Sequence, residues 1–175
     1  WFYQQNEDDK VTSLKKLFNI YLNSVGGNAS LLLNVPPDQT GKIAMHDAMT
    51  LDAFGRMLKR EFPHDLLERA HACSTSETDP EHGAANVLHA ADSFWQAAED
   101  DVCPELVLDF GADTAFDSIV LQENISTGQQ IEAFELYINR RHRWNNIGKY
   151  TVIGYNTLCR FSQTYHSNKI RLVIK

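Results

Sequence analysis

The stretch LLLNVPPDQTG, residues 31–41, decides how the first third of the chain is interpreted. Three consecutive leucines, followed by Asn34 and Val35, form a run without the polar–apolar alternation of a half-exposed strand. Such runs are typical of parallel strands that are covered on both faces. Pro36 and Pro37 remove two backbone donors and fix φ, so the strand must end there. We therefore predict a buried parallel strand that ends in a rigid polar loop.

Amphipathic helices are predicted on both sides of this strand. Residues 11–25 place apolar side chains at helical spacing, with Thr12 or Ser13 as the N-cap and Gly26–Asn28 at the end. Residues 47–62 repeat the helical spacing, and Pro63 ends the pattern. The apolar positions are Leu14, Leu17, Phe18, Tyr21, Leu22 and Val25 in the first helix, and Leu51, Phe54, Leu58 and Phe62 in the second.

With the strand-like Trp1-Phe2-Tyr3 at the start, the order is strand, helix, strand, helix. A βαβα piece of this size leaves strand edges and helix faces with too few partners to be stable alone. We interpret residues 1–63 as the closing part of a larger (β/α)8-like barrel, whose other parallel strands this polypeptide does not supply. The loop after residue 33 then lies at the C-terminal rim, where barrel active sites are found.

After Pro63 the periodicity changes from helical to alternating. Residues 104–111, 134–139 and 169–175 each place apolar side chains at every second position, and turn signals occur at 126–129 and 143–146. Residues 74–83 have no periodicity and are predicted to be a loop. The predicted fold class is therefore α/β plus all-β, with an antiparallel β-sandwich over residues 66–175.

Composition excludes several classes of partner. The chain has 175 residues and a formal net charge of −7, whereas nucleic-acid binding needs a basic face. The basic cluster RRHR at 140–143 is interpreted as a solvated hairpin tip. No apolar run is long enough for a membrane span, so we expect no membrane partner. Seven histidines without an i, i+4 pair do not predict a zinc site, and no cofactor is expected.

Two further patterns depend on the cellular compartment. Cys73, Cys103 and Cys159 are an odd number without metal-ligand spacing, so they do not identify a redox compartment. The sequons NAS at 28–30 and NIS at 124–126 matter if the source organism glycosylates proteins.

Several motifs resemble a known enzyme family. WFYQQNEDDK, LKKLFNIYLNSVGGNASLLLNVPPDQTGKI and DAFGRML look like the end of the catalytic barrel of glycoside hydrolase family 29, the α-L-fucosidases. The form LLLNVPPDxxG resembles the branch that acts on α-1,3- and α-1,4-linked fucose. DSFWQA, ELVLDFG, FDSIVLQENISTGQQIEAFELYI, IGYNTLCRF and KIRLVI are similar to the discoidin-like (coagulation factor 5/8 C-type) jelly-roll sandwich that follows this barrel.

The resemblance implies a retaining hydrolase that releases α-linked L-fucose from oligosaccharides or glycoprotein glycans. Such an enzyme uses one carboxylate as nucleophile and a second as acid/base, about 5–5.5 Å apart. In the family the nucleophile, and in most members the acid/base, precede the WFY segment, so no catalytic residue is expected among these 175 residues. The remaining barrel is the implied partner, and a periplasmic, secreted or lysosomal location of the parent enzyme is expected.

Three residues are substrate-binding candidates by this resemblance. Trp1 falls where the family has an aromatic residue, which would wall the methyl group on fucose C5; the alternative is a core tryptophan. Asp8, in the acidic run 7–9, would bond a sugar hydroxyl or else belong to a solvated loop. Asn34 would contact substrate or else tie down the rim loop.

The sandwich carries a second hypothesis, a non-catalytic carbohydrate-binding or adhesion module with residues 1–62 as a helical neck. Related modules bind galactose-type sugars or calcium, and LHAADSFW at 88–95 keeps Asp92 and Trp95 of the family pattern but loses its earlier acidic pair. Asp92 is thus a weak calcium candidate. Trp95 and Trp144 are interpreted as core residues. The resemblance also implies one more closing strand beyond KIRLVIK.

Overall fold

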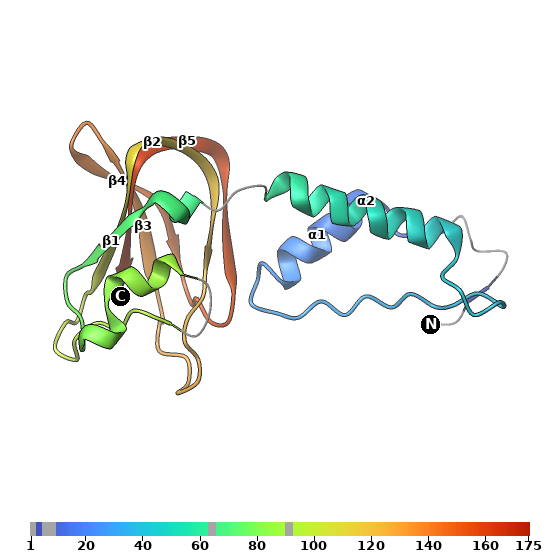
Figure 1. Ribbon diagram of the computed structural model, residues 1–175, viewed down its shortest axis with the longest axis horizontal. Coiled ribbons are helices and arrows are strands. Elements are labelled where there is room, and N and C mark those ends of the chain that lie inside the picture. The colour runs from blue at the N-terminus through green and yellow to red at the C-terminus, as the bar shows by residue number, and fades with distance from the viewer. Residues whose placement is uncertain (1–2, 5–9, 63–65, 90–92) are drawn as a thin grey trace. The chain divides into compact units, whose positions relative to one another are not determined.

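The fold is described from a computed structural model, in which residues 3–4, 10–62, 66–89 and 93–175 are described. The chain forms two compact units, Trp1–His64 and Asp65–Lys175, and each has its own apolar core. The first unit is helical and the second contains a β-sheet (Figure 1).

The first unit is a pair of packed helices, α1 (Leu14–Ser24) and α2 (Met45–Glu61). Leu17 and Phe18 of α1 are buried against Phe54 of α2, as the helical spacing predicts. Ser13 caps α1, because its side chain accepts a hydrogen bond from the Lys16 N–H at 3.4 Å. Half-buried side chains surround this core, namely Leu14, Tyr21, Leu22, Met57, Leu58 and Phe62.

The predicted strand at residues 31–35 is absent from the structure. This segment has no regular secondary structure, and the Leu32 side chain is 94% exposed. A strand exists only when a neighbouring strand pairs with its N–H and C=O groups, and the described residues provide none here. The leucines are therefore not enclosed by their own chain. Of the other predicted strand, Trp1 and Phe2 lie outside the described residues.

The second unit is built on one five-stranded sheet in which every neighbouring pair is antiparallel, as predicted. The strand order is β1-β2-β5-β3-β4. The strands are β1 (His71–Ser74), β2 (Glu105–Leu121), β3 (Phe134–Arg140), β4 (Arg143–Tyr150) and β5 (Thr157–Ile174). Short 3-10 helices, η2 (Leu66–Arg69), η3 (Pro80–His82) and η4 (Ala84–Leu88), flank β1.

Strands β2 and β5 are long enough to take part in two layers. The first part of β2 pairs with the last part of β5 inside the five-stranded layer, where Leu106 lies opposite Leu172. The register then shifts twice, Gly111 adopts φ +73°, and the two strands arch over as a two-stranded ribbon (Figure 1). This ribbon contributes Phe116 and Cys159 to the apolar core.

The core between the layers follows the predicted alternation. Phe134, Leu136 and Ile138 of β3 are fully buried, and Ile170 and Leu172 of β5 are also buried. Fully burying a side chain of this size stabilises a fold by roughly 1.5–3 kcal/mol, so these three β3 side chains contribute strongly to the stability of the core.

The hairpin between β3 and β4 differs from the expectation in one respect. Residues 143–146 were predicted to be a turn, but they belong to β4, and the turn is formed by Arg141 and His142. Arg140 to Arg143 are all exposed, which confirms the predicted solvated tip. The predicted turn after β2 is found at residues 126–127.

Candidate functional site

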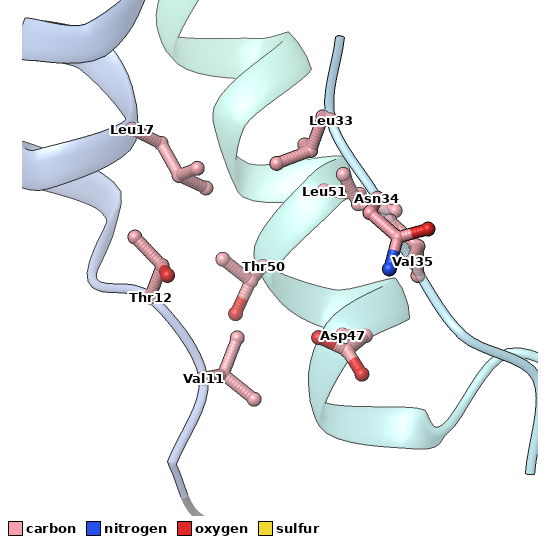
Figure 2. A pocket seen from close by; sticks show the side chains of 9 residues that line it. All are labelled: Val11, Thr12, Leu17, Leu33, Asn34, Val35, Asp47, Thr50 and Leu51. Carbon is pink, nitrogen blue, oxygen red and sulfur yellow. The ribbon is translucent and has the colours of Figure 1, made fainter. Parts of the chain in front are cut away.

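A shallow pocket of about 60 Å³ lies in the first unit, beside the segment that contains Asn34 (Figure 2). Its walls come from the chain ahead of α1, from α1, from residues 33–35 and from α2. The lining residues are Val11, Thr12, Leu17, Leu33, Asn34, Val35, Asp47, Thr50 and Leu51. Pockets that enclose a small ligand usually measure roughly 300–1,000 Å³, so this one is too small to hold a sugar by itself.

The lining of the pocket mixes apolar and polar side chains. Leu17 and Leu33 point into it from opposite walls, while Asp47 and Thr50 of α2 add a carboxylate and a hydroxyl (Figure 2). Asn34 is exposed and lies at the edge of this pocket. Among the described lining residues Asp47 is the one carboxylate, whereas glycoside hydrolysis with retention needs two carboxyl groups. The pocket alone therefore does not make a catalytic site.

The other predicted site residues cannot be placed. Trp1, Asp8 and Asp92 lie outside the described residues. Of the predicted site residues, Asn34 is the one with a described position.

The loop that follows Asn34 is tied together by Asp38, a residue that sequence reasoning did not identify. Its carboxylate accepts hydrogen bonds from the Thr40 N–H at 2.7 Å, the Thr40 hydroxyl at 2.7 Å and the Lys42 N–H at 3.1 Å. These bonds hold the pKa of Asp38 below its ordinary value, and the bond from the Thr40 hydroxyl has the largest effect. Pro37 and Ile43 form an isolated bridge across the loop. The pattern Asp-x-Thr-Gly is a recognisable signal for such a turn.

The two tryptophans of the second unit, Trp95 and Trp144, both make contacts within that unit. Trp95 packs against the core, and its indole N–H donates to the Ser76 carbonyl at 3.0 Å. This confirms its interpretation as a core residue. Trp144 differs from that interpretation, because it is half-buried on β4 and lies outside the core cluster.

Trp144 belongs to a stack on the face of the sheet opposite the core. The Arg171 guanidinium carbon lies 4.7 Å from the centroid of the Trp144 ring and 4.6 Å from that of Tyr137. One Arg171 nitrogen, Nη1, also donates to both Glu105 oxygens, at 3.2 and 3.0 Å. Because the guanidinium covers one face of the indole, Trp144 does not present that face to a sugar.

The described residues contain no group of three His, Cys, Asp or Glu side chains that could hold a metal ion. Within the same residues, no helix is long and apolar enough to cross a membrane.

Comparisons with known proteins match both units. Residues 1–61 match the family model described as alpha-L-fucosidase, and residues 70–175 match the F5/8 type C domain model. Alpha-L-fucosidase 1 of Arabidopsis thaliana is 31% identical over 180 residues, which cover 99% of this chain and 35% of the relative. The chain thus spans about a third of that relative's length.

Solved structures share the arrangement. A glycoside hydrolase family 29 fucosidase of Ruminococcus gnavus in complex with fucose is 26% identical, with a TM-score of 0.86 over 99% of this chain and 35% of the other. The crystal structure of SpGH29 is 30% identical, with a TM-score of 0.85 over 100% of this chain and 38% of the other.

Proposed function

We propose that this chain, which belongs to the F5/8 type C domain family through residues 70–175, is the C-terminal part of an α-L-fucosidase. A fucosidase match at residues 1–61, followed by the sandwich family, has the order of modules that the sequence predicts. The intact enzyme acts on fucose-containing glycans, with α-1,3- and α-1,4-linked fucose as the finer proposal. A periplasmic, secreted or lysosomal location is proposed with it.

One observation carries this proposal, namely the exposure of the leucine segment. Leu32 is 94% exposed and Leu33 is 39% exposed, in the segment that joins the two packed helices. Burying apolar surface stabilises a protein by about 25 cal/mol for each Å² removed from water. We therefore expect other parts of the protein to cover these leucines. Further parallel strands of a barrel would provide that cover and pair its backbone. A self-contained helical neck for a binding module would instead bury its own leucines.

Within this proposal the chain contributes the barrel rim rather than the catalytic carboxylates. Trp1 supplies an apolar wall for the fucose methyl group, because an aromatic face packs there without stranding a polar group. Asp8 and Asn34 hydrogen-bond sugar hydroxyls, with Asn34 held just ahead of the loop that Asp38 ties together. The nucleophile and the acid/base come from the rest of the barrel.

A chimera tests the proposal. This chain replaces the corresponding third of the Arabidopsis thaliana relative, and release of nitrophenol from a nitrophenyl α-L-fucoside is measured. We expect turnover from the chimera and none above buffer from the 175-residue chain alone. Leu32→Asp should abolish turnover in the chimera, because it places a charge between strands. Val102→Asp is the matched control, since Val102 is 91% exposed, and it should keep activity.

Three results would contradict the proposal. Turnover by the isolated chain would show that it holds its own catalytic carboxylates. Full activity of the Leu32→Asp chimera would show that the segment is not covered by barrel strands. A chimera that is folded by circular dichroism but inactive would likewise argue against it. Binding of the isolated chain to a glycan array would favour the carbohydrate-binding module.

A further inference from the structure

An N-glycosylation sequon, Asn124-Ile125-Ser126, lies in the loop between β2 and β3. All three residues are exposed, and Ile125 is a large apolar side chain left in contact with water. A glycan needs such a position, because the attached oligosaccharide is bulky and hydrophilic. Neither the fold nor the proposed hydrolase activity uses these residues.

The sequon is folded into a compact local turn. The Asn124 side-chain oxygen Oδ1 accepts from the Ser126 N–H at 3.1 Å and from the Ser126 hydroxyl at 2.7 Å. Both bonds use the oxygen and not the amide nitrogen Nδ2. Within the described part of the chain, no residue hydrogen-bonds to this nitrogen. The reactive atom of the sequon is therefore available at the surface.

The rest of the loop is held by hydrogen bonds that do not involve Asn124. One Glu123 oxygen accepts the Gln130 N–H at 2.6 Å and the Ile131 N–H at 2.9 Å. The other accepts the Gly154 N–H at 3.0 Å, which ties the loop to the segment after β4. The Gly128 N–H closes the turn on the Ile125 carbonyl at 3.0 Å. A substituent on Asn124 would displace none of these bonds.

We infer that Asn124 is an acceptor site for an N-linked oligosaccharide. The donor class is a lipid-linked oligosaccharide pyrophosphate. Asn124 Nδ2 forms a bond to C1 of the first sugar, the C1–oxygen bond breaks, and the lipid pyrophosphate leaves with that electron pair. Nδ2 loses one proton in the step. The Ser126 hydroxyl acts on the same amide through its 2.7 Å bond to Oδ1.

The second sequon provides a comparison inside the same chain. Asn28 lies at the end of α1 with φ +65°, and the next residue's N–H is bonded to the Ser24 carbonyl at 2.8 Å. It also precedes the exposed leucine segment by three residues. Ser30→Ala removes this sequon, so that any remaining glycan reports on Asn124 alone.

The test expresses the full 175-residue chain behind a secretion leader in eukaryotic cells. The Ser30→Ala chain is compared with Ser30→Ala/Ser126→Ala and Ser30→Ala/Ser126→Thr. Intact mass is measured before and after peptide-N-glycosidase, in both lysate and medium, because transfer occurs on entry into the secretory pathway. We expect one enzyme-sensitive glycan in Ser30→Ala, its loss in the Ser126→Ala variant and its retention in the Ser126→Thr variant.

Folding is checked separately. Because the Asn124 amide nitrogen makes no bond in the described structure, we expect the same melting temperature for the glycosylated Ser30→Ala chain and for that chain made without a glycan in bacteria. Absence of an enzyme-sensitive mass in Ser30→Ala would overturn the inference, as would a glycan that survives Ser126→Ala. Neither result depends on fucosidase activity, so this inference can fail while the proposed function stands.

Discussion

At the scale of single residues, Cys159 illustrates how burial changes reactivity. Its side chain is buried in the core of the second unit, and burial raises the pKa of its thiol to about 11. The nucleophilic form of cysteine is the thiolate, so a raised pKa makes the group inert near neutral pH. Cys73 and Cys103 are exposed instead. The three cysteines that the sequence could not distinguish thus fall into two classes.

Iodoacetamide should therefore modify the native chain at Cys73 and Cys103 but not at Cys159 when applied at pH 8. Mass spectrometry of the intact chain and of its peptides measures the sites. Labelling in urea is the control, and there all three thiols should react. Rapid modification of Cys159 in the native protein would show that the core is not closed around it.

The hydrogen bonds of Asp101 predict how the stability of the protein changes at acidic pH. Its carboxylate accepts hydrogen bonds from the hydroxyls of Ser76 and Thr75, both at 2.6 Å. These bonds hold the pKa of Asp101 below its ordinary value of 3.8 in the folded state. The folded-state pKa is depressed, so the stabilisation is present above the ordinary pKa and is lost as pH falls through the folded-state pKa.

We expect the free energy of unfolding to decrease when pH falls below about 4, the ordinary pKa range of carboxyl groups. Asp101→Asn should reduce the slope of this decrease, and urea titrations at several pH values measure it. Asp100→Asn is the matched control at a neighbouring position. An unchanged slope in Asp101→Asn would assign the acid sensitivity to other carboxylates.

At the scale of elements, the hairpin between β3 and β4 has an unusual turn. Arg141 and His142 both adopt positive φ, at +51° and +61°, as a two-residue hairpin turn of type I′ requires. Non-glycine residues pay about 1–2 kcal/mol in this region, which is why Asn-Gly is the usual choice. The double substitution Arg141→Asn/His142→Gly should raise stability by about 1–2 kcal/mol.

Chemical denaturation measures this gain against Arg141→Lys, which keeps both the charge and the conformational demand. We expect Arg141→Lys to leave the midpoint unchanged. A double variant no more stable than the parent chain would mean that other contacts of the two side chains offset the strain.

Alternating strands were the most predictable elements. Period two correctly placed Leu106, Leu136 and Leu172 in the core, since every second side chain of a half-buried strand faces inward. Strand β1 was missed because four residues are too short to show periodicity. The second half of β2 was missed because Gly111 resembles a strand end, whereas it marks the bend where the strand crosses to the other layer.

Elements that depend on partners were the least predictable. The composition of residues 31–35 is that of a buried strand, yet the segment has no regular structure where no strand pairs with it. Residues 143–146 contain two asparagines and were taken for a turn, but cross-strand pairing with β3 decides their conformation. In the site, Asn34 could be found from its place after the leucines, whereas Asp38 was missed although the pattern Asp-x-Thr-Gly signals the turn that it holds.

At the scale of the whole molecule, the isolated chain carries an uncovered apolar segment. Leu32 is accompanied on the exposed surface of the first unit by Leu33, Ile43, Met45 and Met49. Exposed apolar groups of this kind favour association with other molecules. We therefore expect the 175-residue chain to self-associate at increasing concentration.

Leu32→Lys should reduce this self-association, measured by light scattering over a concentration series. Val102→Lys is the matched control, because it adds the same charge at a side chain of similar exposure in the second unit. Equal reduction by both substitutions would point to a general charge effect and not to the leucine segment.

The arch of β2 and β5 has a consequence for how the second unit opens. The same two strands, β2 and β5, run through the five-stranded layer and the two-stranded ribbon, so their hydrogen-bonded ladder joins the two layers. Amide protons on the two sides should then exchange with solvent in a common event, as one cooperative foldon. If the unit opens cooperatively, a destabilising substitution in either layer lowers the stability of both. Substitutions should then be tolerated mainly in the loops that join the strands.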